Sequence, residues 1–155
     1  MLYPMGFHIT WGTYGTRLHG SSKPHVDNDH NEYGTPFPPT DPRREEESRD
    51  RMKFDPVYLT PQQRKLVEEA IHNIAKKYNW IIHAIAAQRD HVHVVITALR
   101  EGEKLRDALK AVASRELNKQ FGAQIWWAEK GSAKYLWERS YFQNATKYVS
   151  DQRDF

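Results

Sequence analysis

Two long amphipathic segments, and the strand-like runs between them, constrain the fold of this chain more than any other feature. The run Thr60-Pro61-Gln62-Gln63 is a strong helix start. Thr60 can cap the helix, Pro61 suits the first helical position, and Gln63 can close a capping box. Apolar residues then recur every three to four positions, at Leu66, Val67, Ala70, Ile71, Ile74 and Tyr78. This spacing predicts a helix that packs one face against a sheet.

The residues after this helix predict two paired strands. The runs 80–87 and 91–97 are short and rich in β-branched residues, and the polar turn Gln88-Arg89-Asp90 between them is typical of a hairpin. Both are expected to be central strands. A second amphipathic helix is expected over about 103–120, because leucine and valine recur on one of its faces and Gly122 can cap its C-terminus.

Shorter patterns complete the order of elements. Residues 7–11 alternate apolar with polar side chains, which is typical of a strand with one buried face. Tyr135-Leu136-Trp137 resembles a short final strand, and residues 141–152 resemble a terminal helix. The resulting order, β-α-β-β-α-β plus one helix, predicts an α+β fold with a ferredoxin-like antiparallel sheet and a C-terminal helix.

The segment at about 17–59 interrupts this order. It holds six of the eight prolines and shows little periodicity, apart from a possible short helix that begins at Asp41-Pro42. Its histidines and aspartates, at positions 19–30, are irregularly spaced, so no metal site is expected there. Because 155 residues suit one domain better than two, we interpret the chain as a single domain, 1–155, with an insertion at about 17–59.

Composition excludes several classes of protein. Cysteine is absent, which excludes disulfides, thiolate metal sites and a cysteine nucleophile, so any metal must be held by nitrogen and oxygen ligands. No apolar run approaches the ~20 residues that cross a bilayer, and no signal-type stretch opens the chain. We therefore expect no membrane association and a cytoplasmic location. The net charge of +3 favours an anionic partner only slightly.

The pair His91-Val92-His93 is the first candidate functional feature. On a strand, residues two apart point to the same face, so both imidazoles project together and could converge on one metal. For an isolated His-x-His pair, two polar side chains exposed to solvent are the more common explanation. The surrounding sequence must therefore decide between a metal site and two solvent-exposed side chains.

That context resembles a known family, the HUH single-strand DNA transposases, and specifically the REP-associated tyrosine transposases of the IS200-like group. Their hallmarks are a His-hydrophobic-His strand and one nucleophilic tyrosine on a later helix, which this chain matches at His91-Val92-His93 and Lys147-Tyr148-Val149. The segments Ile9–Thr16, Leu109–Asn118 and Gly131–Trp137 also resemble the family. The likeness extends over nearly the whole chain.

The resemblance implies a divalent metal, Mg²⁺ or Mn²⁺, bound by His91 and His93. In such enzymes the tyrosine helix also supplies a polar ligand about one turn after the nucleophile, and Gln152 lies four residues after Tyr148. Residues four apart share one face of a helix, so Gln152 is the expected third ligand. Asn144, one turn before Tyr148, is the alternative.

The same resemblance makes Tyr148 the expected nucleophile. A phenol has an ordinary pKa of ~10, so attack at neutral pH requires a phosphate that is made more electrophilic and held in line. The expected product is a 5′-phosphotyrosine with a released 3′-hydroxyl, and the reverse step rejoins strands without ATP. Tyr141 is the nearest rival nucleophile, and a packed aromatic on an amphipathic helix is the other interpretation of Tyr148.

Single-stranded or hairpin DNA is the expected partner. Basic residues spaced four apart give the second helix a cationic surface suited to phosphates. Lys110 and Arg115 also lie in a family-like segment and are the expected DNA contacts, with a merely solvated face as the alternative. Related transposases often dimerise, so a homodimer is possible, although the sequence leaves the oligomeric state open.

Other aromatic and polar residues are expected to be structural. Trp126, Trp127 and Trp137 could stack on bases, but tryptophans next to strands are more often buried, so we expect them in the core. His8 shares the polar face of the first strand with Thr10 and could border the active site. We expect its role to be structural.

Three other functions are compatible with the same residues. A replication initiator or relaxase-like nickase also uses paired histidines and a tyrosine to cut one strand. A domesticated relative would bind hairpin DNA without cutting it. A metal-dependent hydrolase would activate water through His91 and His93, and would leave no covalent protein–DNA species.

Overall fold

An antiparallel sheet forms the centre of the molecule. The computed structural model describes residues 3–16 and 54–154. Within these residues four strands follow the spatial order β2-β3-β1-β4, and they span Gly6–Gly12 (β1), Ile81–Ala87 (β2), His91–Thr97 (β3) and Ser132–Leu136 (β4). This order, with its antiparallel pairings, is that of a ferredoxin-like β-α-β-β-α-β unit, so the expected α+β class is confirmed.

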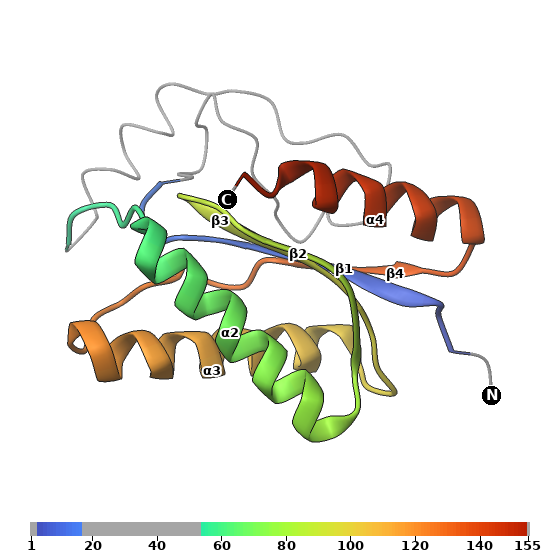
Figure 1. Cartoon of the computed structure of the whole chain (residues 1–155), viewed down its shortest axis with the longest axis horizontal. Coiled ribbons are helices and arrows are strands. Elements are labelled where there is room, and N and C mark those ends of the chain that lie inside the picture. The colour runs from blue at the N-terminus through green and yellow to red at the C-terminus, as the bar shows by residue number, and fades with distance from the viewer. Residues whose placement is uncertain (1–2, 17–53, 155) are drawn as a thin grey trace.

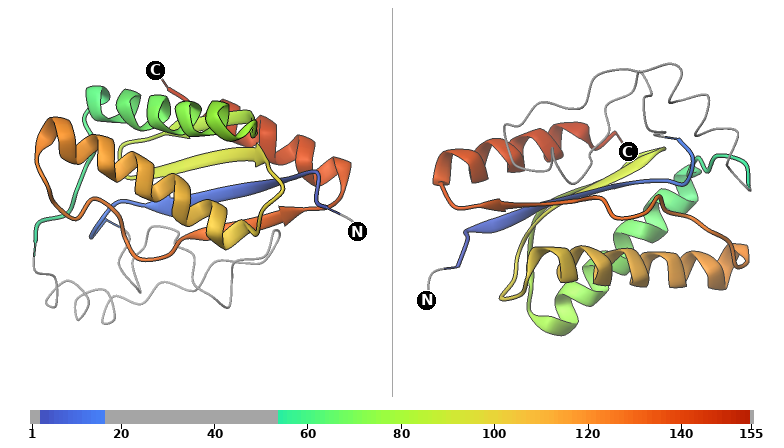
Figure 2. Two further views of the ribbon diagram at one scale, coloured as in Figure 1. Left: turned by 90° about the horizontal axis from the view of Figure 1, so that it is seen from below. Right: turned by 180° about the vertical axis from the view of Figure 1, so that it is seen from behind.

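The helices lie on both faces of the sheet. α2 (Pro61–Tyr78) and α3 (Gly102–Phe121) lie side by side on one face, and α4 (Arg139–Gln152) covers the other (Figures 1 and 2). Thr60 caps α2 as expected: its hydroxyl accepts from the Gln63 backbone N–H at 3.2 Å, and the Gln63 side chain accepts from the Thr60 N–H at 2.9 Å. Among the described residues, no helix is both long and apolar enough to cross a bilayer.

Alternation along the central strands produces two separate hydrophobic cores. Val94 of β3 is fully buried in the larger core, between the sheet and the pair α2 and α3. The smaller core lies under α4, where Val149 packs with Val95. Because strand residues two apart face the same side, His91 and His93 lie with Val95 on the α4 side of the sheet.

The expectation that both hairpin strands are central is wrong for β2. β2 pairs with β3 on one side and forms an edge of the sheet, because β1 occupies the other side of β3. Its first residue, Ile81, is accordingly 57% exposed. Of the two hairpin strands, only β3, which carries the histidine pair, has a neighbouring strand on both sides.

The last strand lies slightly earlier than expected. β4 begins at Ser132 instead of Tyr135, because its pairing with β1 extends as far as Thr10 opposite Ser132. Trp137 therefore follows the strand and is 55% exposed, so its expected place in the core is wrong. Trp126 is buried as expected.

Most of the expected insertion at about 17–59 lies outside the described residues. The short helix predicted from Asp41, and the histidines and aspartates at positions 19–30, also lie outside them. The end of the segment is described: Leu59 is buried in the larger core, and its N–H donates to the Arg89 carbonyl at 2.8 Å. These last residues pack against the turn that precedes β3.

Candidate active site

The histidine pair lies on the face of β3 that α4 covers. His91 and His93 have ring centroids 4.6 Å apart, with ring planes at 88° to each other. The sheet pairs His93 with Thr10 of β1 on one side and with Ala86 of β2 on the other, and His93 is buried. His91 is next to the turn and is less enclosed. The pair is therefore held by a rigid central strand.

α4 brings Tyr148 to this pair. Ala145 and Val149 of α4 are buried against the sheet, which fixes how the helix is rotated over it. Tyr148 then lies beside the strand, with its ring centroid 5.6 Å from that of His93 and 6.2 Å from that of His8. Its side chain remains 49% exposed, so a phenol that contacts the histidines is also accessible from outside.

Tyr141 lies at the other end of α4. It precedes Tyr148 by two helical turns, which is about 10 Å along the helix axis. It is 45% exposed, so exposure alone does not distinguish the two tyrosines. Their positions along α4 distinguish them, because the C-terminal end of this helix lies over the start of β3 (Figure 1).

Each histidine has a polar partner on its Nδ1 side. The Asp90 carboxylate lies 2.6 Å from Nδ1 of His91. Nδ1 of His93 lies 3.1 Å from the Thr10 hydroxyl and 3.1 Å from Nε2 of His8. A metal that binds through Nε2 preserves these contacts, whereas one that binds through Nδ1 would break them.

His8 is buried at the centre of this network. It is 8% exposed, and burial, together with the nearby charge of Lys134, lowers its pKa from 6.5 to about 4. His8 is therefore neutral at neutral pH. Its Nδ1 atom is buried and has no hydrogen-bond partner among the described residues.

Gln152 lies at the same end of the sheet as His91. The side-chain amide of Gln88, in the turn before β3, donates to Oε1 of Gln152 at 3.3 Å, and the Gln88 backbone N–H donates to the His91 carbonyl at 2.8 Å. Beyond Gln152, Arg153 pairs with the buried Glu68 of α2 at 3.2 Å. The end of the tyrosine helix is thus tied to the body of the domain.

These residues suit a divalent cation. Among residues 3–16 and 54–154, no three His, Cys, Asp or Glu side chains gather as a metal site. Two imidazoles and the amide oxygen of Gln152 would form a mixed nitrogen and oxygen set, which is compatible with Mg²⁺ or Mn²⁺. Asn144, the alternative ligand, is exposed on α4.

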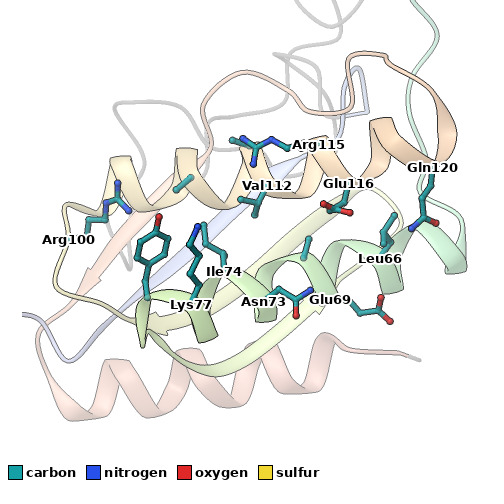
Figure 3. A pocket seen from close by; sticks show the side chains of 14 residues that line it. Leu66, Glu69, Asn73, Ile74, Lys77, Arg100, Val112, Arg115, Glu116 and Gln120 are labelled. Atoms are coloured by element: carbon teal, nitrogen blue, oxygen red, sulfur yellow. The ribbon is translucent and has the colours of Figure 1, made fainter.

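The two predicted DNA contacts lie across the sheet from Tyr148, on α3. The ammonium of Lys110 donates to the carbonyls of Ala128 and Lys130 at 2.9 and 2.7 Å, and burial, with the nearby charge of Arg106, lowers its pKa to about 8. Arg115 lines a groove between α2 and α3 (Figure 3). Contact of either residue with DNA stays a prediction.

Sequence reasoning gave no role in the site to Asp90 or Thr10, and it expected the role of His8 to be structural. The signal for Asp90 was its place directly before His91, at the end of the polar turn. For His8 and Thr10 the decisive information is the β1–β3 register, which sets Thr10 opposite His93. No local pattern encodes that register.

Comparisons with known proteins find a matching family and similar folds. Residues 52–153 match the family described as Transposase IS200 like. A candidate transposase from Deinococcus radiodurans R1 superposes with a TM-score of 0.53 at 13% identity, covering 100% of this chain and 95% of that one. A REP-associated tyrosine transposase bound to a REP hairpin superposes with a TM-score of 0.56 at 12% identity, covering 96% of this chain and 68% of that one. A search of curated proteins finds no match.

Proposed function

Because the chain belongs to the IS200-like transposase family, we propose that it cuts and rejoins single-stranded DNA with Tyr148 as the nucleophile. The resemblance found in the sequence is thereby confirmed at the level of the family. The proposal concerns the finer chemistry, which is the covalent step, the metal and the substrate.

One observation carries the proposal. Tyr148 and His93 come from segments far apart in the chain, yet their rings lie 5.6 Å apart on the α4 side of the sheet. A tyrosine that served only as packing would turn its ring into the core, where the Val149 side chain lies, whereas Tyr148 is half exposed beside a buried histidine. That position suits a phenol that must meet an incoming phosphate.

The proposed reaction is a transesterification. The phenol oxygen of Tyr148 attacks the scissile phosphorus and loses its proton. The bond from phosphorus to the 3′-oxygen breaks, and that oxygen takes up a proton and leaves as a 3′-hydroxyl. The 5′-phosphotyrosine conserves the phosphodiester bond energy, so attack by another 3′-hydroxyl rejoins strands without an external energy source.

We propose that His91, His93 and Gln152 hold a divalent cation, with Mg²⁺ or Mn²⁺ as the expected ions. When bound, such an ion would withdraw charge from the scissile phosphate and help to orient it. His91 and His93 would supply imidazole nitrogens from a rigid strand. Gln152 would supply an amide oxygen from the helix that also carries Tyr148, so the nucleophile and the ligand would be positioned together.

The proposed partner is single-stranded DNA that includes a hairpin. The relative named above as bound to a REP hairpin supports a folded strand as substrate. Lys110 and Arg115 lie on the far face of the sheet, so as DNA contacts they would bind a part of the strand remote from the scissile phosphate. The net charge of +3 is compatible with a modest electrostatic contribution.

A covalent-adduct assay tests the proposal. The protein is incubated with hairpin oligonucleotides labelled at the 3′ end and Mn²⁺, then denatured and separated by electrophoresis. Wild type is expected to form a labelled adduct that resists denaturation, Tyr148→Phe to form none, and the matched control Tyr141→Phe to react like wild type.

The other outcomes assign the competing functions. Nicking without an adduct would indicate a hydrolase, and hairpin binding without nicking would indicate a binding protein. An adduct that persists in Tyr148→Phe would refute the assignment of the nucleophile. An adduct on strands without a hairpin, with no rejoining, would favour a relaxase-like nickase.

A further inference from the structure

The two histidines of the pair are held from the same side of their rings. Asp90 contacts Nδ1 of His91 at 2.6 Å, and Thr10 and His8 both lie 3.1 Å from Nδ1 of His93. All three partners lie outside the set His91, His93, Gln152 and Tyr148 that the proposed reaction uses. Their contacts follow one geometric rule, which is that each engages Nδ1.

The chemistry of its partner assigns the proton at Nδ1 of His91, whereas the two partners of His93 can each donate or accept. A carboxylate only accepts, so contact with Asp90 places a proton on Nδ1 of His91, and in the neutral ring the lone pair is then on Nε2. When His93 binds a metal through Nε2, its proton must also lie on Nδ1. Two acceptors are available there, the Thr10 hydroxyl oxygen and Nε2 of His8.

In that state the contacts around His93 can be assigned as one chain of donors and acceptors, which ends at the buried Nδ1 of His8. Nδ1–H of His93 donates to the Thr10 oxygen, and the Thr10 hydroxyl, which lies 3.3 Å from Nε2 of His8, donates onward. The proton of His8 then lies on its own Nδ1. Each of the three contacts among His93, Thr10 and His8 is thus compatible with metal bound at Nε2 of His93.

Asp90 is itself held from the end of β1. The Thr13 N–H donates to the Asp90 carbonyl at 2.9 Å, and the hydroxyls of Thr13 and Thr16 lie 3.2 and 3.5 Å from the same oxygen. Both threonines are buried and contact each other at 2.9 Å. The family-like segment Ile9–Thr16 therefore supports both histidines: Thr10 directly, and Thr13 and Thr16 through Asp90.

We propose that Asp90, Thr10 and His8 are positioning residues that orient His91 and His93 through Nδ1, so that a divalent cation binds through Nε2 of both rings. The inference rests on the proposed function, because that function supplies the reason for a metal. Loss of such outer contacts typically weakens metal affinity 10–100-fold. The same loss is expected here.

Mn²⁺ titration of purified protein, by calorimetry or by electron paramagnetic resonance of the free ion, tests the inference without catalysis. Thr10→Val removes one hydroxyl at constant shape and is expected to weaken Mn²⁺ binding about 10-fold or more. Asp90→Leu is expected to weaken it towards the 100-fold end, while Asp90→Asn, which keeps an acceptor, recovers part of the loss.

Thr97→Val is the matched control. Thr97 also lies on β3, its hydroxyl donates to the Met5 carbonyl at 2.6 Å, and it contacts His83 rather than the pair. Its loss is expected to leave Mn²⁺ affinity unchanged. Nitrogen-15 NMR of the histidine rings gives a second measurement: in metal-free wild type, the proton of His91 is expected on Nδ1.

Failure of the inference is distinct from failure of the proposed function. If wild type binds Mn²⁺ and forms the tyrosine adduct, but Thr10→Val and Asp90→Leu bind Mn²⁺ as wild type does, the positioning roles are refuted alone. If wild type binds Mn²⁺ and the variants weaken it, but no adduct forms, the proposed function fails and the positioning roles stand. Absence of Mn²⁺ binding, or a His91 proton on Nε2, overturns the inference.

Discussion

Lowering the pH should destabilise this protein through one buried histidine. Burial, and then the charge of Lys134, lowers the pKa of His8 from its ordinary 6.5 to about 4 in the folded state. The unfolded chain therefore binds more protons than the folded chain between these two values. Above pH 6.5 the protonation of His8 does not lower the free energy of unfolding, and stability is lost as the pH falls from 6.5 towards 4.

The magnitude follows from the size of this change in pKa. A fall from 6.5 to about 4 corresponds to roughly 3 kcal/mol once the pH is below both values. About 2 kcal/mol of that loss is expected between pH 7 and pH 5. For a domain whose total stability is ~5–15 kcal/mol, this is a measurable fraction.

Urea unfolding at pH 7, 6 and 5 measures the effect, with a chelator present so that no metal competes for the histidines. His8→Asn removes the titrating ring, so its free energy of unfolding should fall by about 2 kcal/mol less than that of wild type over this range. His72→Asn, at an exposed position on α2, is the control and should follow wild type. Any contribution from His83 cancels in the comparison.

Equal pH dependence in wild type and His8→Asn would refute the reasoning. It would mean that His8 is solvated or charged in the folded protein, and that burial on the α4 side of the sheet does not control its protonation. A greater dependence in the variant would be equally contradictory, because removal of a group with a lowered pKa can only flatten the profile in this range.

Other expectations follow from single contacts. Thr60→Ala should lower the free energy of unfolding by about 1 kcal/mol in urea, because α2 loses its capping hydroxyl; no change would show that the capping box is dispensable. Val149→Ala should lower the free energy of unfolding by about 2 kcal/mol in urea, because it leaves a cavity under α4. It should also slow adduct formation, because the cavity loosens the helix that carries Tyr148. A normal rate of adduct formation in this destabilised variant would contradict that effect. Lys110 has a folded pKa of about 8, below its ordinary 10.5, so wild type should gain stability from pH 8 to 10 relative to Lys110→Met. Parallel curves of unfolding free energy against pH in the two proteins would contradict this lowered pKa.

Much of the fold was predictable because it depends on local patterns. The helix start at Thr60 satisfies its own backbone groups, and the alternation around Val92 and Val94 identifies a strand with one apolar face. These features need only near neighbours in the chain. The bounds of β3 were predicted as they are observed, because a polar turn precedes it and its apolar run is short.

The remaining features depend on pairing between distant segments. The start of β4 is set by how far β1 pairs with it, so a β-rich run around Tyr135 could not fix Ser132 as the first residue. The edge position of β2 follows from β1 taking the other side of β3. Trp137 was expected in the core from its residue type, but the end of the strand leaves it exposed.

The candidate site shows the same division. His91 and His93 on one face follow from strand alternation, and Tyr148 was selected by the family resemblance. The network of His8 and Thr10 with His93 requires the β1–β3 register across more than eighty residues. Lys110 was expected to face DNA from its spacing on a basic helix, yet its ammonium binds the carbonyls of the loop before β4.

The most direct test of the account is to identify the residue that carries the DNA. Wild-type protein is reacted with a hairpin oligonucleotide and Mn²⁺, digested with protease and nuclease, and analysed by mass spectrometry for the peptide that retains a nucleotide. The account predicts a 5′-phosphate linked to Tyr148 and an unmodified Tyr141. A nucleotide on Tyr141 or on another residue, or a reaction that cuts DNA and leaves every peptide unmodified, would contradict it.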